Sequence, residues 1–397
     1  MEIGGEFCFA DISAAADGEA RVADLLDGWS RRYPVTLLSS GRSAYLNFWL
    51  TLRHAGRELD AVLLPSYLCY SILMPFRRMG IRVEYYRVDA DLSPDWQDLE
   101  RKAEKLGGRA AAVIVNYFGF PESGNADAAR AIDRIRQTGT CVVYDATHSL
   151  LNYCPWPVED SCLDSAPVAV PLADVCITSL RKALPVVDGA AVVWLGGARP
   201  APALRATAER IDSYFSSRAL AMVLKASYVL DDCGIRQNYL NLYDQAEAAL
   251  DGELSATGAM SGVSRSIIKR LDVERIRRAR RENYAELVKE LHGQGARRGQ
   301  EGSRLGFGLL FPELPDGVVP LGCPVVADER DALREHLATR GILTQVLWQS
   351  PPEVPREEFQ ESWLLSQRIL VLPCDQRYSA QHMAEVARAV RQWLSSR

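Results

Sequence analysis

The 397-residue sequence predicts an α/β fold with a large, doubly wound and mostly parallel sheet domain and a smaller C-terminal α+β domain. Between residues 35 and 195, short apolar runs alternate with helical patterns, which is the order of strand–helix–strand units. The runs are apolar throughout and do not alternate with polar residues, which indicates strands that helices cover on both faces.

The predicted elements of the large domain follow one another in a regular order. Strands are expected at 35–39, 61–65, 83–87, 110–116, 141–145, 174–178 and 190–195, with helices at 43–55, 72–79, near 95–106 and at 126–139. Residues 201–250 are rich in Ala, Leu and Tyr and are expected to form a helical insertion. We therefore assign residues 1–250 to the large domain.

Residues 251–397 are predicted to contain a long linking helix and the small domain. Apolar residues from Ile267 to Leu291 form one face of this single helix, and the arginines of 275–281 are expected on its solvated face. Beyond a glycine-rich break, strands are expected at 305–311, 320–326, 342–347 and 369–372, and helices at 328–340, between the last two strands, and at 379–394. A domain of about 100 residues is of ordinary size.

Charge and composition exclude several classes of function. The net charge of −5 leaves no basic excess, so nucleic acid is not expected as a partner. The N-terminal stretch lacks the basic and apolar regions of a signal peptide, and no apolar run reaches the ~18 residues of a membrane span. Nine scattered cysteines without a C-x-x-C pair argue against a disulfide framework and a zinc site. We expect a cytoplasmic protein without a metal.

Polar residues that follow the predicted strands are candidate site residues, because ligands in an open α/β sheet bind at the carboxyl ends of strands. The first stretch, Ser40-Gly41-Arg42-Ser43, opens a helix whose free N–H groups, together with the charge of Arg42, would attract an anion. For this stretch alone, a helix cap by Ser40 or Ser43 is the more common explanation.

Two further stretches follow strands. Asn116 and Tyr117 could face a ligand, although "VNYFGFP" alone indicates only a Gly/Pro turn. Asp145 ends an apolar strand, and His148 lies three residues on. A carboxylate in this place can hold the proton on an aromatic ring nitrogen. The alternative is that Asp145 caps the next segment and that His148 is incidental.

The fourth stretch, "SLRKALPVVDG", places Lys182 between two apolar strands, with Ser179 three residues before it. A surface hairpin with solvated Arg181 and Lys182 is the simpler interpretation of this stretch alone, since lysine is seldom fully buried without a partner. An anion cradle, an aspartate with a nearby histidine and a Ser-x-x-Lys, in this order, together predict a pyridoxal phosphate site. Lys182 would form the Schiff base, and Asp145 would keep the pyridine nitrogen protonated.

The chain resembles the DegT-type sugar aminotransferase family of the fold type I pyridoxal-phosphate-dependent enzymes. The stretches that carry the resemblance are "LLSSGRSAYL", "LLPSYLCYS", "VNYFGFP", "YDATHSL", "SLRKALPVVDGAAVV", the "MS" of 260–261, "RRARRENYAELVKEL" and "LPCDQRYSAQHM". They run through nearly the whole chain in family order.

This resemblance implies an aspartate aminotransferase fold, pyridoxal 5'-phosphate as the cofactor and a homodimer with its active site at the interface. The implied reaction transfers an amino group from an amino acid to a nucleotide-linked keto-sugar, in polysaccharide or natural-product biosynthesis. The alternative is another reaction of the same cofactor on a small molecule: dehydration, decarboxylation or condensation of an amino acid or natural-product intermediate. A non-catalytic protein that binds the cofactor is a further alternative.

The resemblance also implies a role for individual residues. Lys182, Asp145 and His148 would be catalytic, with His148 contacting the ring hydroxyl of the cofactor. The other implied cofactor-binding residues are Ser179 and Gly41, Arg42 and Ser43 at the phosphate, with Asn116 and Tyr67. Weaker candidates for contacts with the substrate are Tyr117, Trp348, Arg377 and Tyr378, and Arg377 could pair either with an anionic substrate group or with a loop carboxylate.

The sequence also departs from the family pattern. Cys69 stands where the family carries an aromatic residue that stacks on the cofactor, so that Tyr67 or Tyr70 would have to replace it. The serine lies three residues before Lys182, where the family has it five before. Residues 257–259 are Thr-Gly-Ala, where the family has an Asn-Tyr-Arg that reaches the neighbouring subunit. The cofactor is therefore better supported than the sugar substrate.

Overall fold

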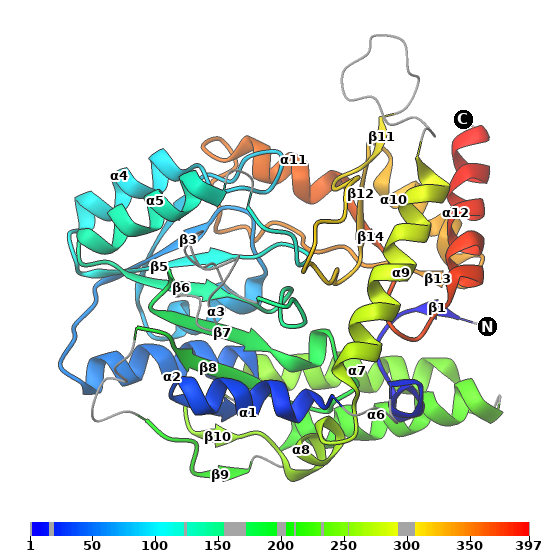
Figure 1. Cartoon of the computed structure of the whole chain (residues 1–397), viewed down its shortest axis with the longest axis horizontal. Coiled ribbons are helices and arrows are strands. Elements are labelled where there is room, and N and C mark those ends of the chain that lie inside the picture. The colour runs from blue at the N-terminus through cyan, green and yellow to red at the C-terminus, as the bar shows by residue number, and fades with distance from the viewer. Residues whose placement is uncertain are drawn as a thin grey trace.

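The computed structural model describes residues 2–15, 20–122, 125–154, 172–196, 204–209, 212–231, 234–252, 254–292 and 306–396. It confirms the predicted α/β architecture, because a nine-stranded, mostly parallel sheet carries helices on both faces and a smaller α+β part lies at one end of it (Figure 1). Within the described ranges, no helix combines the length and the apolar character that a membrane crossing requires.

The central sheet has the strand order β4-β3-β5-β6-β7-β8-β2-β10-β9. Its strands are β2 Val35–Leu38, β3 Ala61–Pro65, β4 Arg82–Tyr86, β5 Ala110–Val115, β6 Cys141–Asp145, β7 Val175–Ser179, β8 Ala190–Trp194, β9 Ala208–Glu209 and β10 Gly258–Ala259. Neighbours from β4 to β7 are parallel, whereas β8 is antiparallel to both β7 and β2. Every residue of β3, β5, β6, β7 and β8 is buried, as the continuous apolar runs predict.

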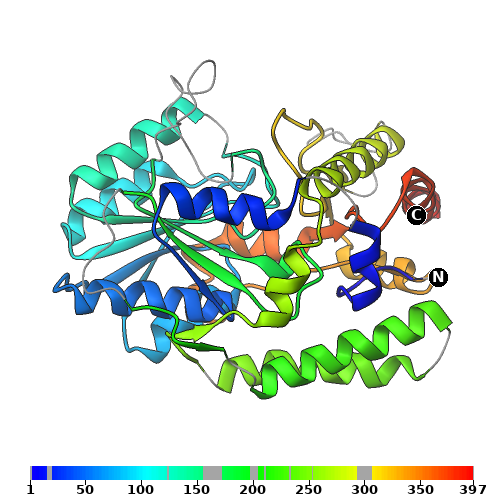
Figure 2. The ribbon, with the colours of Figure 1, turned by 60° about the horizontal axis from the view of Figure 1, so that its bottom comes forward.

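Helices cover both faces of this sheet. They are α1 Val22–Arg32, α2 Gly41–His54, α3 Tyr70–Arg78, α4 Trp96–Leu106 and α5 Asn125–Gln137. Helices α2 and α3 lie together on one face, and α4 and α5 lie together on the other (Figure 2). The side chain of Ser40 caps α2 by accepting a 3.1 Å hydrogen bond from the N–H of Ser43, which fixes where this helix begins.

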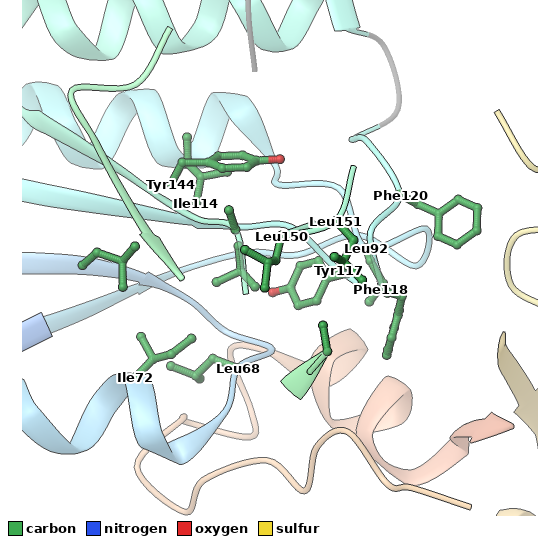
Figure 3. Close-up of a cluster of buried hydrophobic side chains, with 14 of the residues drawn as sticks. Leu68, Ile72, Leu92, Ile114, Tyr117, Phe118, Phe120, Tyr144, Leu150 and Leu151 are labelled. Carbon is green, nitrogen blue, oxygen red and sulfur yellow. The ribbon is translucent and has the colours of Figure 1, made fainter. Parts of the chain in front are cut away.

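The hydrophobic core reaches the turns that follow β5 and β6. Ile114 at the end of β5, and Tyr117, Phe118, Leu150 and Leu151 in the two turns, are buried and form part of the cluster in Figure 3. Burying one such large apolar side chain contributes about 1.5–3 kcal/mol to the free energy of folding. The cluster therefore holds in place the two turns that carry the candidate polar residues.

The expected helical insertion is a helical hairpin, formed by α6 Ser213–Asp231 and α7 Arg236–Gly252. It extends along one side of the molecule (Figure 2). Its two helices pack on each other and on the large domain through a small cluster that includes Met222, Tyr239 and Val187. The preceding β9 is a strand of the large sheet, which the helical pattern did not predict.

The single long helix predicted after residue 251 is wrong. The chain forms α8 Gly262–Ile268 and α9 Val273–Leu291, because the side chain of Asp272 caps a new helix by accepting a hydrogen bond from the N–H of Arg275. The expectation of solvated arginines is also wrong for two of them. Arg277 and Arg280 are buried, because backbone carbonyls of neighbouring loops accept their N–H groups.

The small domain contains a three-stranded antiparallel sheet of β11 Phe307–Leu309, β12 Cys323–Ala327 and β14 Ile369–Leu372. Helices α10 Arg330–Ala338, α11 Gln360–Arg368 and α12 Ala380–Ser395 complete it. The strand expected at 342–347 is only the two-residue β13 Ile342–Leu343, which pairs in parallel with β1 Ile3–Gly4. The start of the chain therefore lies beside its C-terminal part (Figure 1). The domain boundary at residue 250 stays a prediction.

Candidate active site

One cavity of about 610 Å³, partly open to solvent, lies where β5, β6 and β7 end and α2 begins. Because these three strands are parallel neighbours, the residues that end or follow them meet at one edge of the sheet. The predicted residues in the cavity lining are Gly41, Arg42, Asn116, Asp145, His148, Ser179, Lys182 and Trp348. Ser43, Tyr67, Tyr117, Arg377 and Tyr378 are not in this lining.

Asp145, the last residue of β6, is held by two hydrogen bonds. Its Oδ2 accepts a 2.6 Å bond from the hydroxyl of Tyr45, and its Oδ1 accepts a 2.8 Å bond from the N–H of Thr147. Burial raises the pKa of Asp145, and these two bonds to the charged form oppose that rise. The carboxylate therefore has a fixed orientation at the base of the cavity.

His148 lies between two aromatic side chains in the turn after β6. Its ring stacks with that of Phe118 at 5.6 Å and with that of Trp348 at 5.2 Å between centroids. Nδ1 accepts a 3.0 Å hydrogen bond from the N–H of Phe118, which assigns the proton of the neutral ring to Nε2. Burial and the nearby charge of Lys182 lower the pKa of His148 to about 3. At neutral pH the ring is therefore an uncharged hydrogen-bond donor.

Lys182 ends a short 3-10 turn, Leu180–Lys182, directly after β7. Its side chain is half-buried, and no hydrogen bond or ion pair joins its Nζ to another residue in the described part of the chain. The charge of Arg181 and burial lower the pKa of Lys182, while the carboxylates of Glu247 and Glu6 oppose this. A lowered pKa makes the neutral, nucleophilic amine more accessible.

Two arginines beside the cavity are paired with helix α7. Arg181 is only 7 % exposed, and its guanidinium binds both carboxylate oxygens of Glu247, at 2.8 and 3.1 Å. Arg42 pairs with Asp251 at 3.1 Å and with Glu247 at 3.6 Å. The interpretation of Arg181 as a solvated hairpin residue is therefore wrong, because a carboxylate that the sequence pattern did not connect to it compensates its burial.

The start of α2 forms a cradle with Ser179. Gly41 and Ser179 are neighbours, because a Cβ on Gly41 would be in van der Waals contact with the Cβ of Ser179, at 3.5 Å. The capping interpretation of this stretch is confirmed for Ser40, and the Ser43 hydroxyl accepts a 3.0 Å bond from the Ser40 hydroxyl. This cap uses only the N–H of Ser43. Among the described residues the N–H groups of Gly41 and Arg42 have no partner, as an anion site requires.

Asn116 lines the cavity, but its amide is used by its own turn. The Nδ2 donates to the carbonyl of Phe120 at 2.9 Å and to the hydroxyl of Tyr144 at 3.0 Å, and the Oδ1 accepts from the N–H of Gly119. Asn116 therefore shapes the wall of the cavity by holding the backbone of the 116–120 turn.

Tyr67 and Tyr117 pack behind the cavity. The hydroxyl of Tyr117 donates to the carbonyl of Tyr67, and the hydroxyl of Tyr67 donates to the carbonyl of Leu347. The rings of both tyrosines contact the ring of Trp348, at 5.8 and 6.2 Å between centroids. Tyr70 is 43 % exposed. The aromatic side chains that line the cavity are Tyr45, His148 and Trp348. Cys69 also belongs to this lining.

Arg377 and Tyr378 attach the N-terminal segment to the small domain. The guanidinium of Arg377 binds both oxygens of Asp375 at 2.8 Å and donates to the carbonyls of Gly5 and Glu6 at 2.9 and 3.2 Å. The hydroxyl of Tyr378 accepts from the N–H of Gly4. The loop ion pair is thus the observed interaction of Arg377, and its contact with a substrate stays a prediction.

Sequence reasoning missed several residues of the site. Tyr45 lies four residues after Gly41 on α2, so the helical period could have placed it on the same face. Thr147 lies between Asp145 and His148 but carries no pattern of its own. Glu247 gives no signal in the sequence. Among the described residues, no group of three or more His, Cys, Asp or Glu side chains could hold a metal ion.

No protein-family model matches the sequence, and no curated protein sequence matches it either. Solved structures do match. The aminotransferase TlmJ from Streptoalloteichus hindustanus aligns over 100% of both chains, with a TM-score of 0.61 and 20% identity. Helicobacter pylori PseC, an aminotransferase involved in the biosynthesis of pseudoaminic acid, aligns over 100% of both chains, with a TM-score of 0.64 and 14% identity.

A further match is the sugar aminotransferase CalS13 from Micromonospora echinospora, which aligns over 96% of each chain with a TM-score of 0.57 and 18% identity. These similarities extend over nearly the full length of each chain. They confirm the predicted fold: this chain has the aminotransferase fold that the three proteins share.

Proposed function

We propose that this protein is a pyridoxal-phosphate-dependent aminotransferase that transfers an amino group from an amino acid to a nucleotide-linked keto-sugar. One observation carries the proposal: Lys182, Asp145 and His148 line the same cavity as the cradle of Ser40, Gly41 and Ser179. These residues come from three separate parts of the chain. The fold shared with solved aminotransferases supports the same conclusion.

The residues present fit pyridoxal phosphate. The unpartnered amine of Lys182 would bind the cofactor aldehyde. The free N–H groups of Gly41 and Arg42 and the hydroxyl of Ser179 would hold its phosphate, at the positive end of the α2 dipole. The fixed carboxylate of Asp145 would hold a proton on the ring nitrogen.

Bound pyridoxal phosphate supplies an electron sink for the negative charge left when the substrate carbon loses a proton. Lys182 Nζ is the group that takes this proton and returns it, and its lowered pKa favours the neutral form that a base requires. Asp145 keeps its orientation through Tyr45 and Thr147. His148 would donate a hydrogen bond to the cofactor through Nε2, and the stack on Trp348 keeps its ring in place.

The first test asks whether Lys182 binds the cofactor. Wild-type protein with added pyridoxal phosphate should show the visible absorption band of a lysine-bound cofactor, and borohydride should fix the cofactor on the peptide that contains Lys182. The variant Lys182→Ala should lose both signals. Lys289→Ala, a change of an exposed lysine on α9, should keep them. Absence of the band from wild-type protein, or its survival in Lys182→Ala, would refute the proposal.

The second test addresses the reaction. Glutamate added to the loaded protein should convert the cofactor to its amine form, and a keto-sugar should reverse the change. If no amino acid converts the cofactor while the absorption band is present, the protein carries out another reaction or none.

The proposal extends to the localisation, the oligomeric state and the partners of the protein. We place it in the cytoplasm as a homodimer with the active site at the interface, acting on a small molecule and binding neither nucleic acid nor a membrane. The net charge of −5 supports the absence of a nucleic-acid partner, and the scattered cysteines support the cytoplasm. Leu220 and Val223 on α6 are about half exposed, at 49 and 47 %, which suits burial against a second copy. Light scattering of the purified protein tests the dimer.

A further inference from the structure

A second cavity, of about 690 Å³ and partly open to solvent, adjoins the first. His148, Arg181, Lys182 and Trp348 line both cavities. The other walls of the second cavity come from the N-terminal segment 4–7 and from the small domain. A molecule in this cavity would therefore contact Lys182 and the first residues of the chain at the same time.

The arginines of the second cavity are already paired. Arg181 binds both oxygens of Glu247, and Arg377 binds both oxygens of Asp375. Arg280 is buried and donates to four acceptors: the side chain of Gln376 and the carbonyls of Ala183, Pro320 and Leu321. Among the described lining residues, each arginine of this cavity is therefore already engaged by a counter-ion or by hydrogen-bond acceptors.

Glu6 is the acidic residue of this cavity with a free oxygen. Its Oε2 accepts a 3.0 Å hydrogen bond from Arg218 on α6, while its Oε1 has no partner among the described residues. The side chain is 38 % exposed. Burial opposes ionisation, but the charges of Arg218, Lys182 and Arg181 lower the pKa of Glu6. The free oxygen is thus that of a carboxylate close to Lys182.

The backbone around Glu6 is held on both sides. Its carbonyl accepts hydrogen bonds from Lys225 on α6 and from Arg377 of the small domain. The guanidinium of Arg377 also lies 4.4 Å from the ring centre of Phe7. The position of the Glu6 carboxylate is therefore fixed before any ligand binds, which reduces the entropy lost on binding.

We propose that Glu6 recognises the substrate in the second cavity and that it binds a hydrogen-bond donor, either a hydroxyl or an ammonium group. This inference rests on the proposed function, because Lys182 marks where the chemistry takes place. A carboxylate only accepts hydrogen bonds, and such bonds are stronger when the acceptor is charged. The exposed side-chain amide of Gln345 in the same lining can both donate and accept. The cavity thus suits a polyhydroxylated or amino-substituted molecule.

Calorimetric binding to the full chain with pyridoxal phosphate tests this, with glucosamine, glucose, cyclohexylamine and glutarate as probes. Wild-type protein should bind glucosamine better than glutarate. Glu6→Gln should raise the Kd for glucosamine by about tenfold or more, the size expected for a lost charged hydrogen bond. Loss of glucose binding as well assigns a hydroxyl to Glu6, and loss of cyclohexylamine binding assigns an ammonium group.

Glu2→Gln is the matched control. Glu2 lies in the same N-terminal segment, but it pairs with Arg236 and is outside the second cavity. This variant should keep the wild-type Kd for glucosamine. Unchanged glucosamine binding by Glu6→Gln, or tighter binding of glutarate than of glucosamine by wild-type protein, would overturn the inference.

Two further measurements separate a loss of glucosamine binding from a loss of the cofactor and from unfolding. The visible absorption band reports cofactor binding separately, and it should persist in Glu6→Gln, so that failure of the proposed function is distinct from failure of this inference. Glu6→Gln also leaves the buried Arg218 without its carboxylate. If the variant unfolds, the double variant Glu6→Gln/Arg218→Met removes that charge and must show the same loss of glucosamine binding.

Discussion

The hydroxyl of Tyr45 donates a 2.6 Å hydrogen bond to Oδ2 of Asp145 and thereby joins the first turns of α2 to the end of β6. Both residues are buried. One contact therefore couples the helix that begins with the cradle to the carboxylate of Asp145. Without this hydrogen bond, the Asp145 carboxylate and the first turns of α2 would be held less firmly relative to each other.

Removal of the Tyr45 hydroxyl should change the pKa of Asp145, the turnover and the stability of the protein. In Tyr45→Phe, the charged form of Asp145 loses a hydrogen bond, so the pKa of Asp145 should rise further. We expect about a tenfold loss of turnover and about 1–2 kcal/mol lower stability, the usual cost of a buried hydrogen bond. Steady-state kinetics measure the turnover, the pH titration of the visible band reports the change in ionisation, and urea unfolding measures the stability.

Tyr86→Phe is the matched control for that change. The hydroxyl of Tyr86 is buried and donates to the carbonyl of Val113 at 2.8 Å, outside the lining of the cavity. This variant should lose similar stability and keep its turnover. Equal turnover in the two variants would show that the Tyr45–Asp145 bond has only a structural role.

His148 should make the stability of the protein depend on pH. Burial and Lys182 lower its pKa from 6.5 to about 3, so between these values the unfolded chain binds a proton that the folded chain does not. Stability should therefore fall as the pH is lowered from 6.5, by up to about 1.4 kcal/mol per pH unit. Denaturant unfolding of wild-type protein and His148→Gln at pH 5 to 8 measures this slope.

The variant His148→Gln should lose that part of the slope and keep its stability level above pH 6.5. The same substitution at His54, an exposed residue at the end of α2, measures the effect of losing an imidazole on the surface. Identical slopes for wild-type protein and His148→Gln would contradict the assignment of a buried, neutral ring.

Glu247 should compete with an anion for the arginines beside the cavity. In Glu247→Gln, Arg181 and Arg42 lose the carboxylate that they share, which should destabilise the protein by about 1–3 kcal/mol. Because the two arginines then attract a phosphate more strongly, inorganic phosphate should raise the Tm of this variant more than that of wild-type protein. Thermal unfolding with and without phosphate gives both values.

Glu274→Gln provides a matched comparison for Glu247→Gln. Glu274 is similarly exposed and pairs at 2.6 Å with the buried Arg277, away from the cavity. The variant Glu274→Gln should lose stability, but phosphate should raise its Tm no more than that of wild-type protein. An equal response to phosphate in the two variants would remove the link between Glu247 and an anion site.

A side chain at Gly189 should destabilise the protein. It returns the chain from Lys182 into β8 with φ of 129°, and a Cβ would lie 3.0 Å from Cε of Met260. Gly80→Ala, at a φ of 67° with nothing within 4 Å of its Cβ, should cost only the backbone penalty of about 1–2 kcal/mol. Gly189→Ala should cost more than that in urea unfolding. A smaller loss would show that the turn can rearrange.

The positions of most strands along the chain and the residues at their ends could be predicted from the sequence. Asp145 and Ser179 end strands that are buried on both faces, and such strands show as continuous apolar runs. Because neighbouring parallel strands end at one edge, placing the strands was enough to bring these residues together. Lys182 could be singled out only together with Asp145, His148 and the start of α2, because its own stretch alone indicated a solvated hairpin.

The remaining features depend on contacts that local patterns do not encode. Glu247 meets Arg181 across 66 positions of the sequence, and Glu6 meets Arg218 across 212. Arg280 lies on a helix whose charge pattern indicates a solvated face, but carbonyls of a distant loop satisfy its donors. These pairs become visible only when the hairpin and the N-terminal segment are placed on the sheet.

The position of β2 has a consequence for how the chain folds during synthesis. In the finished sheet β2 lies between β8 and β10, yet the ribosome makes it before β3 to β7. The early strand therefore leaves the exit tunnel with both edges unpaired, and must wait for partners that emerge only after five other strands. Such an exposed early segment is a natural binding site for a chaperone, and non-local pairing of this kind slows folding.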